Sequence, residues 1–244
     1  MERLGRSGGA ETVAISGGVA LFGDAASAPG SLDAAALADA AGARLALLAG
    51  GPIPVLYARQ EHTRIGYVYG AGAPLAPAAH LVGTCDALIT GEPGVGLCVR
   101  TADCLPVALG GGAAVAMVHA GWRGLAADIL GATVRRLELE FGVAPATVDA
   151  VIGVGIGPCH YPVGEDVIAA LSHLECADPG WNGVDRVDLA RWARGRLLAA
   201  GLARERVLSL GGCTCCTPGY HSFRRDGAHA GRQWSAAMAL GPRA

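Results

Sequence analysis

Short apolar runs bounded by glycine, proline or polar residues recur between positions 54 and 156, and this pattern predicts β-strands. Gly110, Gly111 and Gly112 are expected to form a tight turn between two of them. If those strands pair antiparallel, Cys104 and His119 come side by side although 15 positions separate them. Residues before position 31 are expected to form strand and loop. The predicted strands are Pro54–Arg59, Arg64–Gly70, Gly94–Arg100, Leu105–Leu109, Ala113–His119 and Val148–Ile156.

Helical spacing of apolar residues appears in the intervening segments. Residues 122–141 have a regular apolar stripe with arginine and glutamate between, which predicts an amphipathic helix over Trp122–Phe141. The alanine-rich segment Ser31–Ala43 is expected to form a helix capped by Ser31 and ended by Gly42. Three more helices are predicted, at Gly164–Leu174, Val187–Ala200 and Gly231–Leu240.

Strands and helices mix without a regular alternation. The predicted fold class is therefore α/β (α+β), with a single domain over residues 1–244 rather than a doubly wound sheet. The chain has 244 residues, 52% of them hydrophobic and 16% charged, which is enough apolar material for a core without covalent cross-links.

Charge excludes several classes of function. The net charge is −2 and no block of like charge occurs, so we expect no nucleic-acid or membrane partner. We expect a small-molecule ligand instead. All basic residues are arginine, which excludes lysine nucleophiles and Schiff bases. The first residues are charged and glycine-rich, unlike a signal peptide, so a cytoplasmic location with eight reduced cysteines is expected. The sequence leaves the oligomeric state open.

Candidate chemistry concentrates between Arg100 and Gly124, a segment that contains Asp103, Cys104 and His119. Thiolate and imidazole are good ligands for Zn²⁺, and a catalytic zinc site needs a third protein ligand. His62, in a predicted turn, is our candidate for it. The alternative interpretation is a buried core thiol with hydrogen-bonded histidines, because no C-x-x-C or H-x-x-x-H pair marks these residues locally.

Several stretches of the sequence resemble the laccase-domain (multicopper polyphenol oxidase) family, to which YfiH-type and FAMIN-like purine nucleoside phosphorylases belong. The resemblance implies a domain of mixed β-sheets packed between helices, and a metal site formed by His62, Cys104 and His119, with Zn²⁺ as cofactor and copper as the alternative. The matching stretches are Gln60–Thr63 (QEHT), Asp86–Val107, His119–Leu130 (HAGWRGLAADIL), Ile156–Val167, Ser222–Gly227 (SFRRDG) and Ala230–Gln233.

The same resemblance implies phosphorolysis of adenosine, inosine and methylthioadenosine, with adenosine deamination as a second activity. Zinc would activate a water for attack on the base, and Asp103 is our candidate proton carrier or, equally, the partner that fixes a histidine tautomer. Phosphate needs an anion pocket, for which Arg123 is the first candidate, while Arg225, Arg224 and Arg232 are weaker ones.

Two other functions remain as alternatives. A copper-dependent polyphenol oxidase fits the family's older description, although seven histidines without an H-x-H pair are few for several coppers. A metal-free cysteine hydrolase would use Cys104 as nucleophile and His119 as base.

Three weaker motifs complete the candidates. Cys213-Thr214-Cys215-Cys216 suits a soft metal or a redox pair, but the local sequence favours reduced thiols that only pack. His221 and His229 would become ligands if copper were bound. The glycine-rich loop at Gly153–Pro158 lacks the G-x-G-x-x-G spacing of a dinucleotide site.

Overall fold

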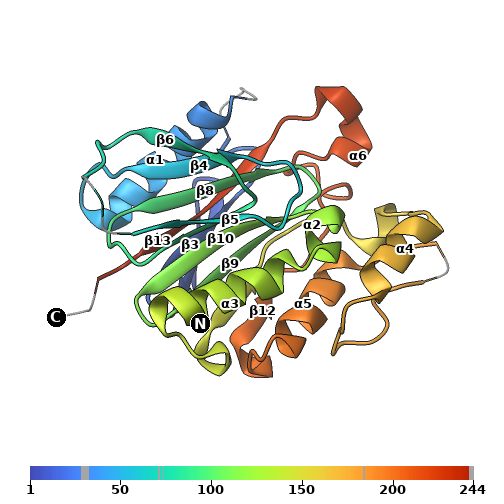
Figure 1. Cartoon of the computed structure of the whole chain (residues 1–244). Helices are drawn as coiled ribbons and strands as arrows, with labels where there is room; N and C mark the ends of the chain where they lie inside the picture. Colours follow the sequence, from blue (N-terminus) through green and yellow to red (C-terminus); the bar gives the residue numbers. More distant parts are fainter. Residues whose placement is uncertain (29–32, 71, 73, 184, 242–244) are drawn as a thin grey trace.

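The computed structural model describes residues 1–28, 33–70, 72, 74–183 and 185–241. Two mixed β-sheets pack face to face, with α1 (Ala34–Ala49) on one outer side and α3 (Ile129–Phe141) and α5 (Leu189–Ala199) on the other (Figure 1). This arrangement confirms the predicted α/β class of mixed sheets between helices. The shorter helices are α2 (Trp122–Ala126), α4 (Glu165–Ser172) and α6 (Phe223–Asp226).

The first sheet has seven strands in the order β1-β2-β3-β13-β8-β4-β6. β4 runs parallel to both β6 and β8, and the remaining pairs are antiparallel. Its strands are β1 Glu2–Ser7, β2 Ala10–Ile15, β3 Gly18–Gly23, β13 Gln233–Ala239, β8 Gly96–Thr101, β4 Val55–Arg59 and β6 Ala79–Thr84.

The second sheet has six strands in the order β12-β11-β9-β10-β7-β5. The predicted hairpin is its centre: β9 and β10 pair antiparallel, with His119 opposite Pro106 and Ala120 opposite Leu105. The start of one strand therefore meets the end of the other, as the sequence predicts. The strands are β5 Gly66–Tyr69, β7 Ala87–Thr90, β9 Leu105–Gly111, β10 Ala114–Ala120, β11 Asp149–Ile152 and β12 Val207–Ser209.

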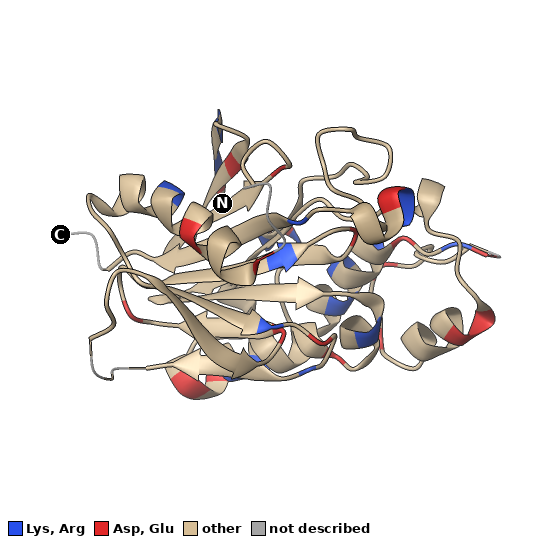
Figure 2. Ribbon diagram, turned by 90° about the horizontal axis from the view of Figure 1, so that it is seen from above, with Lys and Arg blue, Asp and Glu red and all other residues tan. Residues whose placement is uncertain are grey.

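Apolar side chains fill all three interfaces between these layers. Leu97 and Met117, both fully buried, belong to the cluster between the sheets. Trp234 packs with α1 on one outer face, and Trp192 of α5 belongs to the cluster on the other. Figure 2 shows that charged residues lie mostly on helices and loops, so the strands are free to bury both faces.

Residues 233–239 form a strand, β13, so the helix predicted at Gly231–Leu240 is wrong. β13 lies between β3 and β8 in the first sheet, and all its residues are buried. The alanines of this segment favour a helix locally, but a central strand position supplies hydrogen bonds and burial on both sides. Pairing with distant strands, which the local pattern does not contain, decides the conformation.

Two other predicted helices have different bounds. α1 continues past Gly42 and ends at Gly50, which adopts the left-handed conformation with φ of 78°. Gly42 instead permits close packing, because a Cβ there would lie 2.9 Å from a methyl of Val55. The predicted cap Ser31 lies outside the described residues, and Asp33 accepts the capping hydrogen bond from Ala35.

The predicted helix at residues 122–141 is divided into α2 and α3 because Asp128 adopts a left-handed φ of 65°. Its carboxylate caps α3 by accepting a hydrogen bond from Gly131 N. Arg196 of α5 donates to the same carboxylate at 2.7 and 3.2 Å, and Arg135 at 3.0 Å. Asp128 therefore joins helices α3 and α5.

We expect Asp128→Asn to lower the free energy of unfolding by about 2 kcal/mol at pH 7, because it removes charge-assisted bonds while asparagine tolerates the left-handed conformation. Burial raises the pKa of Asp128, but hydrogen bonds from Arg196 and Arg135 outweigh it and hold the pKa below its ordinary 3.8. The contribution of the charged carboxylate is thus present above that pH and is lost on acidification.

Urea unfolding at pH 7 and pH 3 measures this effect, with a smaller difference between mutant and wild type expected at pH 3. Arg136→Gln is the control, since its exposed ion pair with Glu140 contributes little. An equal difference at the two pH values would contradict the assignment.

Candidate metal centre

Three potential metal ligands meet at one end of the hairpin. His62 lies in the turn after β4, Cys104 in the loop between β8 and β9, and His119 near the end of β10. Their ligand atoms all lie within 4.8 Å of one another, and His62 Nε2 is 3.6 Å from Cys104 Sγ. The structure therefore brings together the three residues that the sequence singled out.

Asp86, a residue to which the sequence assigned no role, orients two of these ligands. Its Oδ1 is 2.8 Å from His119 Nδ1 and accepts a hydrogen bond from His62 N at 3.1 Å. Its Oδ2 accepts from Thr63 N and Thr63 Oγ1 at 2.6 and 2.8 Å. Because Nδ1 of His119 is engaged, Nε2 is the ring nitrogen left for a ligand. The signal available in the sequence was the acidic side chain of Asp86 directly before an apolar strand.

The Asp86 contact also corrects one interpretation of Asp103. The sequence offered Asp103 as a partner that fixes a histidine tautomer, and Asp86 has that position instead. Asp103 accepts hydrogen bonds from Thr214 Oγ1 and from Arg224 N, both at 2.6 Å. It thus fastens two later loops to the segment that carries Cys104, in a left-handed conformation with φ of 87°.

Charge within the cluster favours the thiolate. Burial by itself raises the pKa of Cys104, but the charge of His119 and hydrogen bonds from His119 and His62 outweigh it and lower the pKa to about 6. Burial lowers the pKa of His119, but attraction to Cys104 and the bond to Asp86 raise it to about 9. Cys104 is therefore ionised at neutral pH, which is the form that binds metals and attacks electrophiles.

The donor set and its spacing fit a divalent ion such as zinc. Tetrahedral zinc holds a sulfur and a nitrogen ligand about 3.6 Å apart, given bonds of about 2.3 and 2.0–2.1 Å. The separation between Cys104 and His62 matches this value. Gly121 is needed for the approach, because a Cβ there would lie 2.5 Å from the His62 ring and 2.9 Å from Cys104 Sγ.

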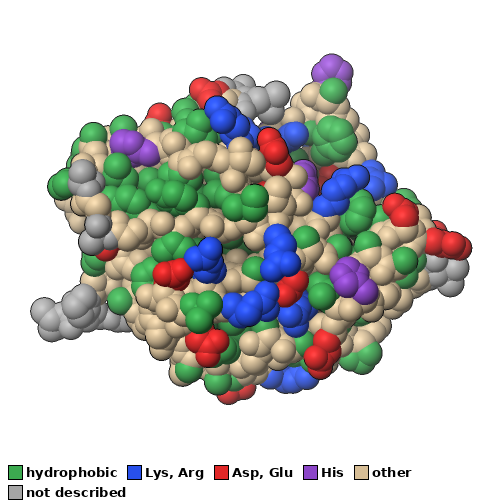
Figure 3. Space-filling view, viewed as in Figure 1, with side chains coloured by type: hydrophobic (Ala, Val, Ile, Leu, Met, Phe, Trp, Pro, Cys, Tyr) green, Lys and Arg blue, Asp and Glu red, His purple; other side chains and the backbone are tan. Residues whose placement is uncertain are grey.

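A cavity of about 610 Å³ opens beside the cluster, and all three candidate ligands line it. Its size is typical of small-molecule sites. Asp103 is the one acidic residue among its lining side chains, whereas four are arginines: Arg100, Arg123, Arg224 and Arg232. Three aromatic rings line it as well, from Trp122, Tyr161 and Phe223. In the space-filling view, arginine side chains are exposed between α2 and α6 (Figure 3).

The two arginines predicted to bind phosphate have different environments. Arg123 lies at the cavity with its guanidinium stacked 4.4 Å from the Trp122 ring centre. Arg225 does not line the cavity: its guanidinium donates to Thr214 O and Tyr220 O and pairs with Asp226. Arg225 is thus engaged in holding its own loop, and neighbouring Arg224 faces the cavity instead.

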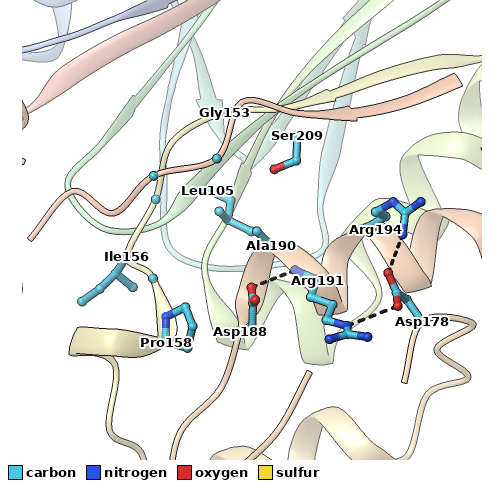
Figure 4. Close-up of a pocket in the computed structure, with 14 residues that line it drawn as sticks. Leu105, Gly153, Ile156, Pro158, Asp178, Asp188, Ala190, Arg191, Arg194 and Ser209 are labelled. Atoms are coloured by element: carbon cyan, nitrogen blue, oxygen red, sulfur yellow. Dashed lines mark hydrogen bonds and ion pairs between the residues drawn. The ribbon is translucent and has the colours of Figure 1, made fainter. Parts of the chain in front are cut away.

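A second cavity of about 420 Å³ lies along the loop at residues 153–158. Its two arginines, Arg191 and Arg194, are both paired with Asp178 (Figure 4). Because both guanidiniums are already paired within the protein, the cavity beside the Cys104 cluster is the stronger candidate for an anion-binding or catalytic site. No helix in the described ranges is long and apolar enough to cross a membrane.

Comparisons with known proteins find relatives over most of the chain. The family model described as multi-copper polyphenol oxidoreductase laccase matches residues 19–240. A Xylella fastidiosa protein named purine nucleoside phosphorylase is 41% identical over 151 residues, 59% of this chain and 56% of that protein. A protein named adenosine deaminase RL5, from an unknown prokaryotic organism, is 31% identical over 62% of this chain and 60% of that protein. The matched region is thus less than two thirds of either relative.

A solved structure agrees over nearly the full length. YlmD from Geobacillus stearothermophilus superposes with a TM-score of 0.80 at 25% identity, covering 98% of both chains. The chain therefore has the same arrangement of layers as YlmD.

Proposed function

The chain belongs to the multi-copper polyphenol oxidoreductase laccase family, and from this premise we propose that it is a zinc-dependent purine nucleoside phosphorylase that also deaminates adenosine. Relatives named purine nucleoside phosphorylase and adenosine deaminase support an enzyme of this kind. The observation that carries the proposal is one cavity that combines a Cys/His cluster, four arginines and three aromatic rings.

His62, Cys104 and His119 would hold the ion. When bound, zinc supplies a Lewis acid that lowers the pKa of a coordinated water and polarises the substrate. One thiolate and two imidazoles leave a fourth position open, as in catalytic zinc sites, and zinc is the ion of our proposal. Asp86 holds Nδ1 of His119, so Nε2 is the nitrogen that would bind the ion after losing its proton, and the pKa of Cys104 is lowered to about 6.

The remaining cavity residues would bind and orient the substrates. The aromatic rings of Trp122, Tyr161 and Phe223 suit the flat purine base, and the arginines suit phosphate through bidentate hydrogen bonds. Asp103 is our candidate for the carboxylate that carries a proton at the base during either reaction. Its two bonds, to Thr214 and to Arg224 N, hold it at the cavity wall.

An assay of the purified protein with adenosine tests the function. We expect release of adenine and ribose 1-phosphate only when phosphate is present, and slower formation of inosine that does not depend on phosphate. Oxygen consumption with a phenol as substrate tests the alternative function, a copper-dependent polyphenol oxidase. Conversion of phenol without any phosphate-dependent product from adenosine would overturn the proposal.

Arg123→Gln tests the anion pocket. We expect the KM for phosphate to rise about 10- to 100-fold, because a hydrogen-bonded charge pair contributes about 1.5–3 kcal/mol. Deamination, which needs no phosphate, is expected to change little. Arg136→Gln is the matched control, since Arg136 pairs with Glu140 on α3 and does not line the cavity. Equal losses in both reactions would argue against a phosphate role.

A further inference from the structure

A second cluster of potential metal ligands lies outside the cavity, and nothing in the proposed function uses it. It consists of Cys159, His160, Cys213 and Cys216, whose ligand atoms all lie within 4.8 Å of one another. Cys216 Sγ is 3.4 Å from Cys159 Sγ and 3.1 Å from His160 Nδ1. None of the four lines the cavity beside Cys104.

The tertiary fold assembles this cluster from two loops. Cys159 and His160 lie in a turn at Pro158–His160 after β11, and Cys213 and Cys216 lie in the loop after β12. Because β11 and β12 are parallel neighbours, their following loops leave the same sheet edge. Cys213 and Cys216 have C-x-x-C spacing, which alone is half of a zinc site, and the other half is more than 50 positions earlier.

Three thiols and one imidazole are the ligands of a Cys₃His structural zinc site. In such a site two sulfurs lie about 3.8 Å apart, and sulfur and nitrogen about 3.6 Å, given bonds of about 2.3 and 2.0–2.1 Å. The separations of Cys216 from Cys159 and from His160 are shorter than these values by about half an ångström or less. Small side-chain rotations would suffice to enclose an ion.

Packing does not explain why these thiols gather. Cys159, His160 and Cys216 are exposed, whereas only Cys213 is buried. Cys215, in the same loop, is partly buried and packs against the apolar cluster beneath it, as a thiol without a ligand role does. The guanidinium of Arg186 donates to the carbonyls of Pro158 and Cys159.

We propose that Cys159, His160, Cys213 and Cys216 bind a second divalent metal ion, zinc by the chemistry of its ligands, which fastens the loop after β11 to the loop after β12. The position of the cluster gives this ion a structural role. Thr214, between two of the ligands, donates to Asp103 at the cavity, and its backbone N donates to Gly155 O. A metal at the cluster therefore stabilises the loop that holds Asp103.

Metal analysis of the purified chain, prepared without chelators in zinc-containing buffer, tests the proposal. We expect two zinc ions per chain in the wild type and one in Cys216→Ser. Cys215→Ser is the matched control, because it removes a thiol from the same loop but not from the cluster, and it is expected to keep both ions. Cys216 is exposed, so its replacement opens no core, and circular dichroism verifies that the variant is folded.

Alkylation of the native protein gives a second readout. Exposed free thiols react quickly with iodoacetamide, so protection of Cys159 in the wild type and its rapid alkylation in Cys216→Ser are expected. Equal zinc content in wild type and Cys216→Ser would overturn the proposal, as would a Cys159–Cys216 disulfide found by mass spectrometry in the protein as isolated. Because both readouts count metal and thiols, they do not depend on the proposed nucleoside chemistry.

Discussion

Replacing Cys104 by serine is expected to remove one zinc ion per chain and to lower both phosphorolysis and deamination at least about 10³-fold. The reason is that a bound metal contributes several kcal/mol to transition-state stabilisation, and each 1.36 kcal/mol is a factor of ten. Cys104 is the one thiolate of the cluster, and its Sγ lies 3.6 Å from His62 Nε2. Metal analysis and steady-state kinetics with adenosine measure the two effects.

The same variant separates the metal site from a metal-free cysteine hydrolase. If Cys104 were only a nucleophile with His119 as its base, Cys104→Ser would lose activity while its metal content stayed at the wild-type value. Cys215→Ser, outside both clusters, is the control for the loss of a thiol and is expected to retain metal and activity. Full activity in Cys104→Ser would exclude both mechanisms.

Asp86→Asn is expected to weaken zinc binding about 10- to 100-fold, the effect typical of losing the partner of a metal-ligating histidine. Asp86 is buried and accepts from His119 and from the backbone of His62 and Thr63. Burial raises its pKa, but hydrogen bonds from His119 and Thr63 lower it to about 2, so Asp86 is an acceptor only. An asparagine amide would present a donor to part of this network and would favour the wrong tautomer of His119.

Zinc titration with a competing chelator measures the affinity, and activity restored by excess zinc would distinguish a positioning role from simple loss of structure. Asp149→Asn is the matched control, because Asp149 is equally buried and accepts from Ser16 and Arg206 far from the cluster. It is expected to lower stability without changing zinc affinity. Unchanged affinity in Asp86→Asn would contradict the assignment.

The two predictions show which features of the site were accessible from the sequence. The hairpin that brings Cys104 to His119 is a local structure, with two apolar runs around three glycines, so its register follows from the pattern. His62 was recognisable as a histidine in a polar turn. Asp86 was not, because its role arises only when β7 pairs with β10 and places its carboxylate against His119.

The arginines illustrate the same limit. The sequence alone indicates that the basic side chains of any anion pocket are arginines, because the chain has no lysine. Arg224 and Arg225 are adjacent in sequence, yet one faces the cavity and the other binds the carbonyls of its own loop. The short helix α6 sets this difference, and no residue type in the segment indicates it.

The sequence by itself determined the fold class, the six strands predicted between positions 54 and 156, the position of the outer amphipathic helices and the three residues of the candidate metal centre. Those features depend on periodicity and short loops, which are properties of neighbouring residues. Only the tertiary structure decided that residues 233–239 are a central strand, that Asp86 orients His119, and that Cys159 and His160 meet Cys213 and Cys216. Each of these depends on pairing between segments far apart in the chain, where burial and hydrogen bonding outweigh local preference.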